Sequence, residues 1–82
     1  MALSDQIIGQ GNQLKKHTSE VAQDVLRMGA LVEESFRYSH QALFEGQLHT
    51  IPLIINQDRQ IDYYYRDIEK RCVAILSLQS PV

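Results

Sequence analysis

The fold of this chain depends on one stretch, residues 56–62, which reads Asn56-Gln57-Asp58-Arg59-Gln60-Ile61-Asp62. Its two aspartates are one helical turn apart, and Asp58 occupies a position at which the surrounding apolar pattern predicts a core residue. Like charges at this spacing repel by roughly 0.2–0.5 kcal/mol on an isolated helix. A helix with such a pair on its inner side needs a cation or a set of hydrogen bonds opposite it.

A heptad pattern extends from this stretch in both directions. Its spacings alternate between three and four residues, which predicts a helix over residues 50–79 with one inward-facing seam. Thr50 is the expected N-cap, and Pro52 suits the first turn, where its missing N–H costs little. The segment 80–82, which contains Pro81, ends the helix. The seam consists of Ile51, Ile54, Asp58, Ile61, Tyr65, Ile68, Cys72, Ile75 and Gln79.

The first half of the chain has the period of another amphipathic helix. Asn12 is its expected N-cap and Gly46 its expected left-handed stop, so the predicted helix covers residues 12–46. Two glycines, Gly9 and Gly11, discourage helix in residues 1–11, where we expect a tail or a short turn. The residues expected to face inward are Leu14, Val21, Val25, Met28, Val32 and Phe36, followed by Ala42 and Leu43.

These two helices predict an all-α fold, in which residues 1–82 form one helical unit built as an antiparallel hairpin. In a two-helix hairpin, each helix buries one stripe against the other. The second predicted helix also has apolar residues outside its seam, for example Leu53, Ile55 and Val73. A hairpin alone leaves that surface in water. We therefore expect a third helix from another chain, or a homodimer that forms a four-helix bundle.

Composition and charge limit the class of protein. A net charge of -2 argues against binding to nucleic acid, which requires a basic surface. The apolar runs are far shorter than the roughly 20 residues of a membrane span, and the N-terminus has no signal-peptide pattern, so we expect no membrane insertion. The single cysteine, Cys72, suits a reducing cytoplasm.

The candidate site is the pair Asp58 and Asp62. Two carboxylates on one face of a helix supply oxygen ligands for a metal ion. The alternative is a set of local ion pairs, because Asp62 also precedes Arg66 by four residues, the favourable order for an acid and a base on a helix. The Glu-x-x-His pattern of di-iron bundles is absent, as are phosphate loops and catalytic triads, so we expect no enzymatic activity.

Several short motifs, taken in order, resemble the PhoU family of phosphate-uptake regulators. The match extends over about residues 14–82. Its motifs are Met28-Gly29-Ala30-Leu31-Val32-Glu33-Glu34, Ala42-Leu43, Asp58-Arg59-Gln60-Ile61-Asp62, Ile68-Glu69, Cys72 and Leu78-Gln79-Ser80-Pro81-Val82.

The resemblance implies an architecture and a role. PhoU proteins consist of two tandem three-helix repeats, and this chain matches the N-terminal part of the first repeat, either as a fragment or as a shortened relative. They are cytoplasmic, and they regulate phosphate signalling by contacting a phosphate transporter and a sensor histidine kinase. In the family, an Asp-x-x-x-Asp pair on the second helix faces a Glu-x-x-x-Asp pair on the third helix, and the two pairs together hold iron or zinc. Asp58 and Asp62 match the first pair, so these 82 residues are expected to provide half of a metal site.

The sequence thus favours a non-enzymatic, PhoU-like regulator of phosphate uptake and signalling that binds proteins through its helix faces. A generic helical oligomerisation module with no metal or phosphate role is the alternative. A carboxylate-bridged redox enzyme is a weaker third possibility, because the Glu-x-x-His pattern is missing.

Overall fold

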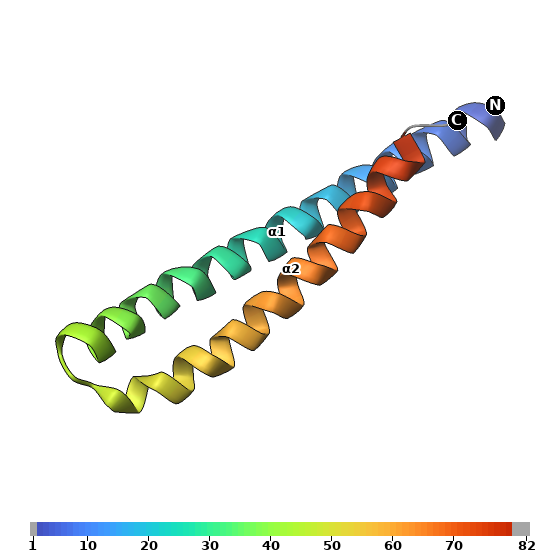
Figure 1. Ribbon diagram of the computed structural model, residues 1–82. Helices are drawn as coiled ribbons and strands as arrows, with labels where there is room; N and C mark the ends of the chain where they lie inside the picture. The colour runs from blue at the N-terminus through green and yellow to red at the C-terminus, as the bar shows by residue number, and fades with distance from the viewer. Residues whose placement is uncertain (1, 80–82) are drawn as a thin grey trace.

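The computed structural model describes residues 2–79, with side chains over residues 11–78. Helix α1 spans Ala2–Phe44, a short 3₁₀ turn (η1) spans Leu48–Thr50, and helix α2 spans Ile51–Gln79. The two long helices run antiparallel as a hairpin, and Figure 1 shows the described ends of both helices at one end of the rod. The expected all-α hairpin is confirmed.

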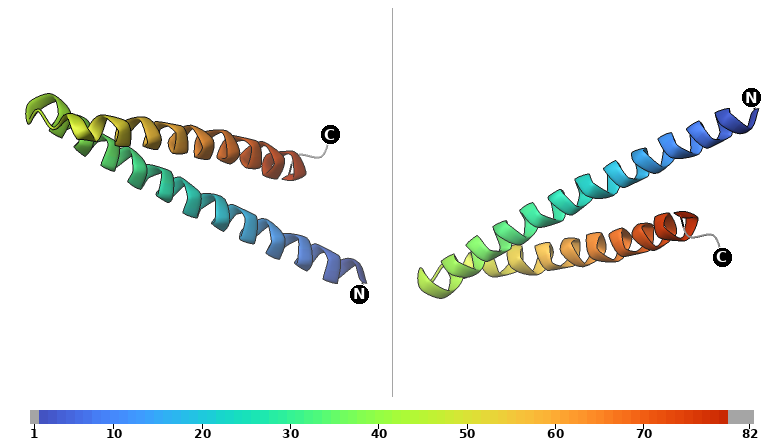
Figure 2. Two further views of the ribbon diagram at one scale, coloured as in Figure 1. Left: turned by 90° about the horizontal axis from the view of Figure 1, so that it is seen from below. Right: turned by 90° about the horizontal axis from the view of Figure 1, so that it is seen from above.

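The hairpin is a thin rod rather than a compact unit. It measures 66 × 20 × 14 Å, and Figure 2 shows the same two-helix layer from two further sides. Its radius of gyration is 18.9 Å, whereas a compact domain of this length has about 12 Å. Val21 is the one apolar side chain among residues 11–78 that is buried, so the helix pair has very little core of its own.

The start of the first helix corrects one prediction. Asn12 lies inside α1 rather than capping it, and residues 2–11 are helical where a tail or short turn was expected. Each glycine in a helix costs about 1 kcal/mol relative to alanine. The residues around Gly9 and Gly11 include strong helix formers, such as Gln10 and Leu14, and the regular turns C-terminal to them propagate the helix through both glycines.

The loop forms largely as predicted. Gly46 has the left-handed backbone (φ 67°) expected of a helix stop, and the amides of Glu45 and Gln47 both donate to the carbonyl of Gln41. Thr50 directly precedes α2, but its buried hydroxyl lies 2.8 Å from the carbonyl oxygen of Gln47 and 3.2 Å from that of Tyr38. The Thr50 side chain therefore ties the start of α2 to the preceding turn and to α1, instead of serving as the simple N-cap that was expected.

The inward side of α2 differs from the predicted seam by one row. Ile54, Ile61, Ile68 and Ile75 are partly buried as expected. The other inward row, however, is Thr50, Gln57, Tyr64 and Arg71. Two members of the predicted row one position later are exposed, since Asp58 lies at the surface and Tyr65 is 58% exposed, whereas Cys72 of the same row is partly buried as expected.

Helix α1 shows the same offset. Leu14, Val21 and Met28 face inward as predicted, but their companion row is Asp24, Leu31 and Tyr38. Val25 and Phe36, which were expected to face inward, are exposed. Heptad rows are about 50° apart around a helix, so on both helices the apolar stripe is rotated by that angle away from the neighbouring helix.

Candidate functional site

The predicted metal pair lies on the surface of α2. The Asp58 side chain is exposed, and the Asp62 carboxylate lies 3.1 Å from Nε of Arg66. The expectation that Asp58 occupies the inner seam is therefore wrong, because Gln57 takes the inward position beside it. Among the described residues no three His, Cys, Asp or Glu side chains come together in a way that could hold a metal ion. The local ion pair that the sequence offered as the alternative is present at Asp62.

Large apolar side chains are left uncovered on both helices. Those that gather on one side are Val25, Phe36 and Leu43 of α1 together with Ile51, Ile55, Tyr65 and Leu76 of α2. Each follows an inward-facing residue by one position, a step that turns a side chain by about 100° around its helix. Because the helices are antiparallel, the same rotation brings both sets to one side of the hairpin. We call this surface, formed by these seven residues and by Asp58 between Ile51 and Tyr65, the uncovered face.

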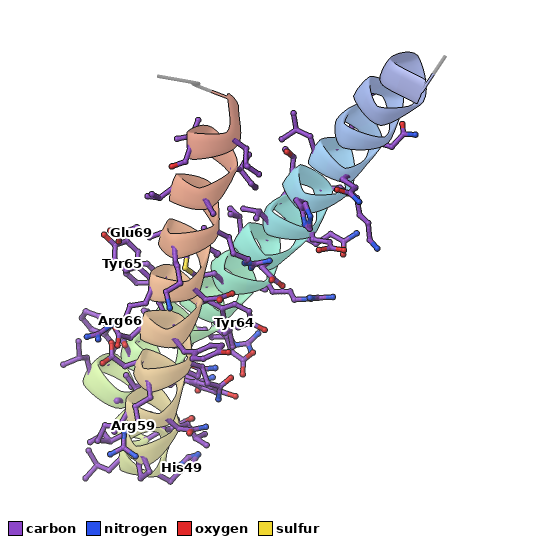
Figure 3. All side chains as sticks on the ribbon, turned by 90° about the vertical axis from the view of Figure 1, so that its right-hand side faces the viewer. His49, Arg59, Tyr64, Tyr65, Arg66 and Glu69 are labelled. Atoms are coloured by element: carbon purple, nitrogen blue, oxygen red, sulfur yellow. The ribbon has the colours of Figure 1, made fainter. Side chains whose placement is uncertain are left out.

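Asp58 belongs to the uncovered face. It follows the buried Gln57 by one position and lies one heptad after Ile51 and one heptad before Tyr65. Figure 3 shows Tyr64 and Tyr65 on different sides of α2, and Tyr64 is the more buried of the two. Tyr65, which was expected in the core, instead stands beside Asp58 on this face. Any segment that packs here meets a carboxylate within an apolar surface.

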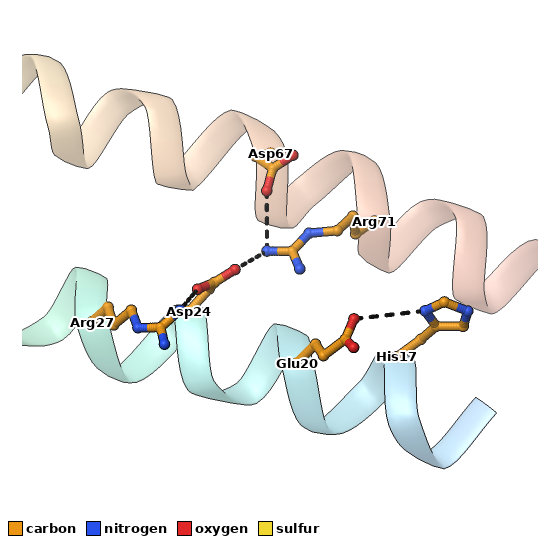
Figure 4. A network of polar contacts seen from close by, with 6 residues as sticks. All are labelled: His17, Glu20, Asp24, Arg27, Asp67 and Arg71. Atoms are coloured by element: carbon orange, nitrogen blue, oxygen red, sulfur yellow. Dashed lines mark hydrogen bonds and ion pairs between the residues drawn. The ribbon is translucent and has the colours of Figure 1, made fainter. Parts of the chain in front are cut away.

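The shortest polar contact between the described side chains of the two helices belongs to an ion-pair cluster that Figure 4 shows in detail. Nη2 of Arg71 lies 2.5 Å from the Asp24 carboxylate of α1 and 3.0 Å from that of Asp67 on its own helix. Arg27 contacts the other oxygen of Asp24 at 2.7 Å. The Arg71 hydrogen bond, and secondly that of Arg27, hold the pKa of Asp24 below its ordinary value, while Asp24 raises the pKa of Arg71.

The sequence reveals only half of this cluster. The Asp67–Arg71 pair has the four-residue acid-to-base spacing of a single helix, which can be read directly from the sequence. Asp24 is 47 residues from Arg71 along the chain, and no local pattern marks it as the partner. Within the described chain, Nε of Arg71 is buried with no hydrogen-bond partner. Arg71 is thus an inward-facing cation whose charge is matched by two carboxylates.

A second polar contact lies nearer the loop. The hydroxyl of Ser35 on α1 donates to Oε1 of Gln57 at 2.7 Å, and Gln57 is 6% exposed. Glu34 accepts a hydrogen bond from the Tyr38 hydroxyl, which raises the pKa of Tyr38, while Glu33 is exposed. Hydrogen bonds and charges thus join α1 and α2 where apolar contact is sparse.

One groove between the helices lies at the end away from the loop. Its volume is about 290 Å³. Its polar rim contains the His17–Glu20 contact, 3.9 Å long, drawn in Figure 4. The groove is mostly apolar, and its cation is already engaged by Asp24 and Asp67. It is lined by His17, Glu20, Val21, Arg71, Ala74, Ile75 and Leu78.

Over the described residues, neither α1 nor α2 is apolar enough along its length to cross a membrane.

Comparison with known proteins gives a consistent result. The family model of the PhoU domain matches residues 25–82. Over 62 residues the chain is 61% identical to a phosphate-specific transport system accessory protein PhoU homolog of Synechocystis, covering 76% of this chain and 28% of that relative. A protein of the same description from Aquifex aeolicus is 30% identical over 69 residues, covering 84% and 31%. The chain thus spans less than a third of the length of these relatives. No solved structure matches it significantly.

Proposed function

The chain belongs to the PhoU domain family, and we propose that it acts as a non-enzymatic, PhoU-like regulator of phosphate uptake and phosphate signalling. The family match over residues 25–82 carries this proposal, together with two relatives named as accessory proteins of phosphate-specific transport systems. An accessory role of this kind is exerted by binding other proteins. The uncovered face is a suitable surface, because contiguous exposed apolar residues mark protein-interaction sites.

The proposed partners are components of a phosphate transporter and a sensor histidine kinase, both reached from the cytoplasm. The relatives' names support the first partner at the level of the transport system. The kinase and the cytoplasmic location rest on the motif resemblance alone. On the hairpin, partner contacts are expected to involve the apolar residues of the uncovered face rather than the inward ion-pair cluster, whose charges are already matched.

A genetic experiment tests this function. In a bacterium that lacks its own PhoU-family gene, expression of the chain is expected to change phosphate uptake and the activity of a phosphate-responsive reporter. A variant with Phe36→Lys on the uncovered face should lose the effect. A variant with Leu26→Lys, whose side chain is similarly exposed but lies on the far side of α1, should retain it. No change in either readout with the chain present, at confirmed expression, would contradict the proposal.

We also propose that Asp58 and Asp62 form half of an iron or zinc site. Two exposed carboxylates one helical turn apart, with Asp58 on the uncovered face, support it. A segment packed on that face would have to supply the remaining ligands, because hard and borderline cations require four to six donors. The Arg66 contact competes with metal for Asp62, so a bound cation would have to displace it.

Elemental analysis of the purified chain tests the metal proposal. The wild-type chain should retain iron or zinc after gel filtration, and the Asp58→Ala/Asp62→Ala double variant should lose it. A Glu33→Ala/Glu69→Ala variant removes two exposed carboxylates from different helices and is the matched control, since it changes the net charge equally. Equal metal content in the wild type and the first double variant would refute the site.

The alternative function, a generic oligomerisation module with no phosphate or metal role, has one observation in its favour, the uncovered face itself. The genetic experiment separates the two. A pure oligomerisation module would self-associate but leave phosphate uptake and the reporter unchanged.

A further inference from the structure

The charged side chains of α2 are distributed unevenly around the helix. Acids and bases are present in equal number over Ile51–Gln79, and the base Arg71 faces inward. The other three bases, Arg59, Arg66 and Lys70, lie in two neighbouring heptad rows that contain no acid. These rows lie about 180° and about 130° from the direction of α1. Positive charge therefore gathers on the side of α2 that points away from α1.

Two exposed apolar side chains stand among these bases. Tyr63 is 69% exposed and lies between Arg59 and Arg66, while Val73 is 59% exposed and follows Lys70 by three residues. The remaining positions of the two rows, 52, 56 and 77, are uncharged. A solvated helix face usually mixes charges of both signs, whereas arginine and tyrosine are enriched at protein interfaces. We call the surface formed by these five residues the outward face.

The bases of the outward face are available to a partner. Among residues 11–78, neither Arg59 nor Lys70 forms an ion pair. Arg66 contacts Asp62 at 3.1 Å, but the two side chains are 77% and 55% exposed. An exposed pair of this kind contributes little stability, so a carboxylate from a partner can compete for Arg66.

The surface of α2 is hollowed at two places along this side. The first hollow, of about 340 Å³, is lined by Arg59, Gln60, Tyr63 and Tyr64, and the second, of about 310 Å³, by Arg66, Glu69, Lys70 and Val73. Arg66 and Lys70 follow Arg59 and Tyr63 by seven residues, so the pattern repeats after about 10 Å. Side chains on one side of a packed helix recur at the same interval, which suits a helical partner.

We propose that the outward face binds an acidic helical segment of a partner protein. Carboxylates at heptad spacing on that segment pair with Arg59, Arg66 and Lys70, and an apolar side chain packs against Tyr63. Charge complementarity supports this occupant, because the three bases form a line of about 16 Å with no acid in it. The outward and uncovered faces lie on different sides of α2, so both can be occupied together.

Two acids at the edge of the outward face restrict how the partner lies. Asp62 and Glu69 occupy the next heptad row, toward the uncovered face, and repel an acidic segment that strays from the line of bases. An anionic membrane fits less well, because the chain has a net charge of -2 and these acids would meet the same headgroups. The proposal rests on the placement of charge and does not require the role in phosphate transport.

Fluorescence anisotropy with two labelled helical peptides tests the proposal on the purified chain. The first peptide has glutamates at heptad spacing along one side with a leucine between them, and the second has the same composition with its glutamates spread around the helix. The chain should bind the first peptide at least about threefold more tightly, and added salt should weaken that binding. This comparison needs no variant, so it stands even if a variant fails to fold.

Two matched comparisons locate the binding surface. Arg59→Gln/Lys70→Gln should weaken binding of the first peptide about three- to tenfold, whereas Lys15→Gln/Lys16→Gln, which removes two exposed bases from α1, should change it by less than about twofold. Tyr63→Ala should also weaken binding at least about threefold. Tyr65→Ala, on the uncovered face, should change it by less than about twofold.

Several results would overturn the proposal. They are no binding of the first peptide at low salt, equal binding of the two peptides, and equal weakening by both members of a matched comparison. Vesicles of phosphatidylglycerol and phosphatidylcholine provide the remaining test. If the chain bound these vesicles more tightly than the peptide, and Arg59→Gln/Lys70→Gln abolished that binding, the outward face would belong to a membrane contact instead.

Discussion

The hydrogen bond between Ser35 and Gln57 allows a sharp test of how the two helices hold together. Gln57 is one of only two buried polar side chains among residues 11–78, and its amide oxygen accepts from the Ser35 hydroxyl at 2.7 Å. In Ser35→Ala the amide oxygen of Gln57 stays buried and loses its donor. Such an unsatisfied group costs about 1–3 kcal/mol, and the better helix propensity of alanine offsets at most about 0.5 kcal/mol of this.

The net loss of roughly 0.5–2.5 kcal/mol should be visible in urea titrations followed by far-ultraviolet circular dichroism, at one fixed protein concentration. For a domain of this size, each kcal/mol corresponds to a fall in melting temperature of about 4–8 °C. Ser39→Ala is the matched control, because the Ser39 hydroxyl donates only to the carbonyl of Ser35 on its own helix. That change should be neutral or slightly stabilising.

A double variant completes the test. Ser35→Ala combined with Gln57→Leu removes both polar partners, so no buried group is left unpaired and most of the lost stability should return. The reasoning would be refuted if Ser35→Ala were as stable as Ser39→Ala. It would also be refuted if the double variant were less stable than Ser35→Ala alone.

Two further predictions concern charge and backbone. Because the folded-state pKa of Asp24 is lowered, its contacts stabilise the fold at pH values above the unfolded-state pKa of about 3.9. This contribution is lost as the pH falls through the lower folded-state pKa. In Asp24→Asn the free energy of unfolding should therefore depend less on pH in that range. Gly46→Ala should lower the free energy of unfolding by about 1 kcal/mol because of its φ of 67°, whereas Gly11→Ala, inside α1, should not lower it in the same urea titration.

The helices and the loop were predictable because their signals are local. Gly46 marks the end of α1, Pro52 falls in the first turn of α2, and the 3–4 spacing specifies both amphipathic helices. The extension of α1 to Ala2 was not predictable from local signals, because Gly9 and Gly11 each disfavour a helix while the helix that follows them propagates through both.

The inward rows were not predictable in the same way. A hydrophobic stripe reports the average direction of everything that a helix packs against, whereas this hairpin contains one neighbour only. The stripe therefore placed Asp58 and Tyr65 inside, while the α1–α2 contact uses Gln57 and Tyr64. Polar inward residues are recognised only through partners far along the chain, as with Asp24 and Arg71, and a single sequence gives no sign of such pairs.

This offset implies a division of labour between the two sides of the hairpin. The inward rows join α1 and α2 through directional contacts, Ser35 to Gln57 and Asp24 to Arg71, which are satisfied in one alignment of the helices only. Such contacts add little net stability, because the polar groups lose water when they pair. The large hydrophobic gain, about 25 cal/mol per Å² buried, remains on the uncovered face and is realised only when something packs there. The polar rows then set the alignment of the hairpin, and we expect whatever packs on the uncovered face to supply much of its stability.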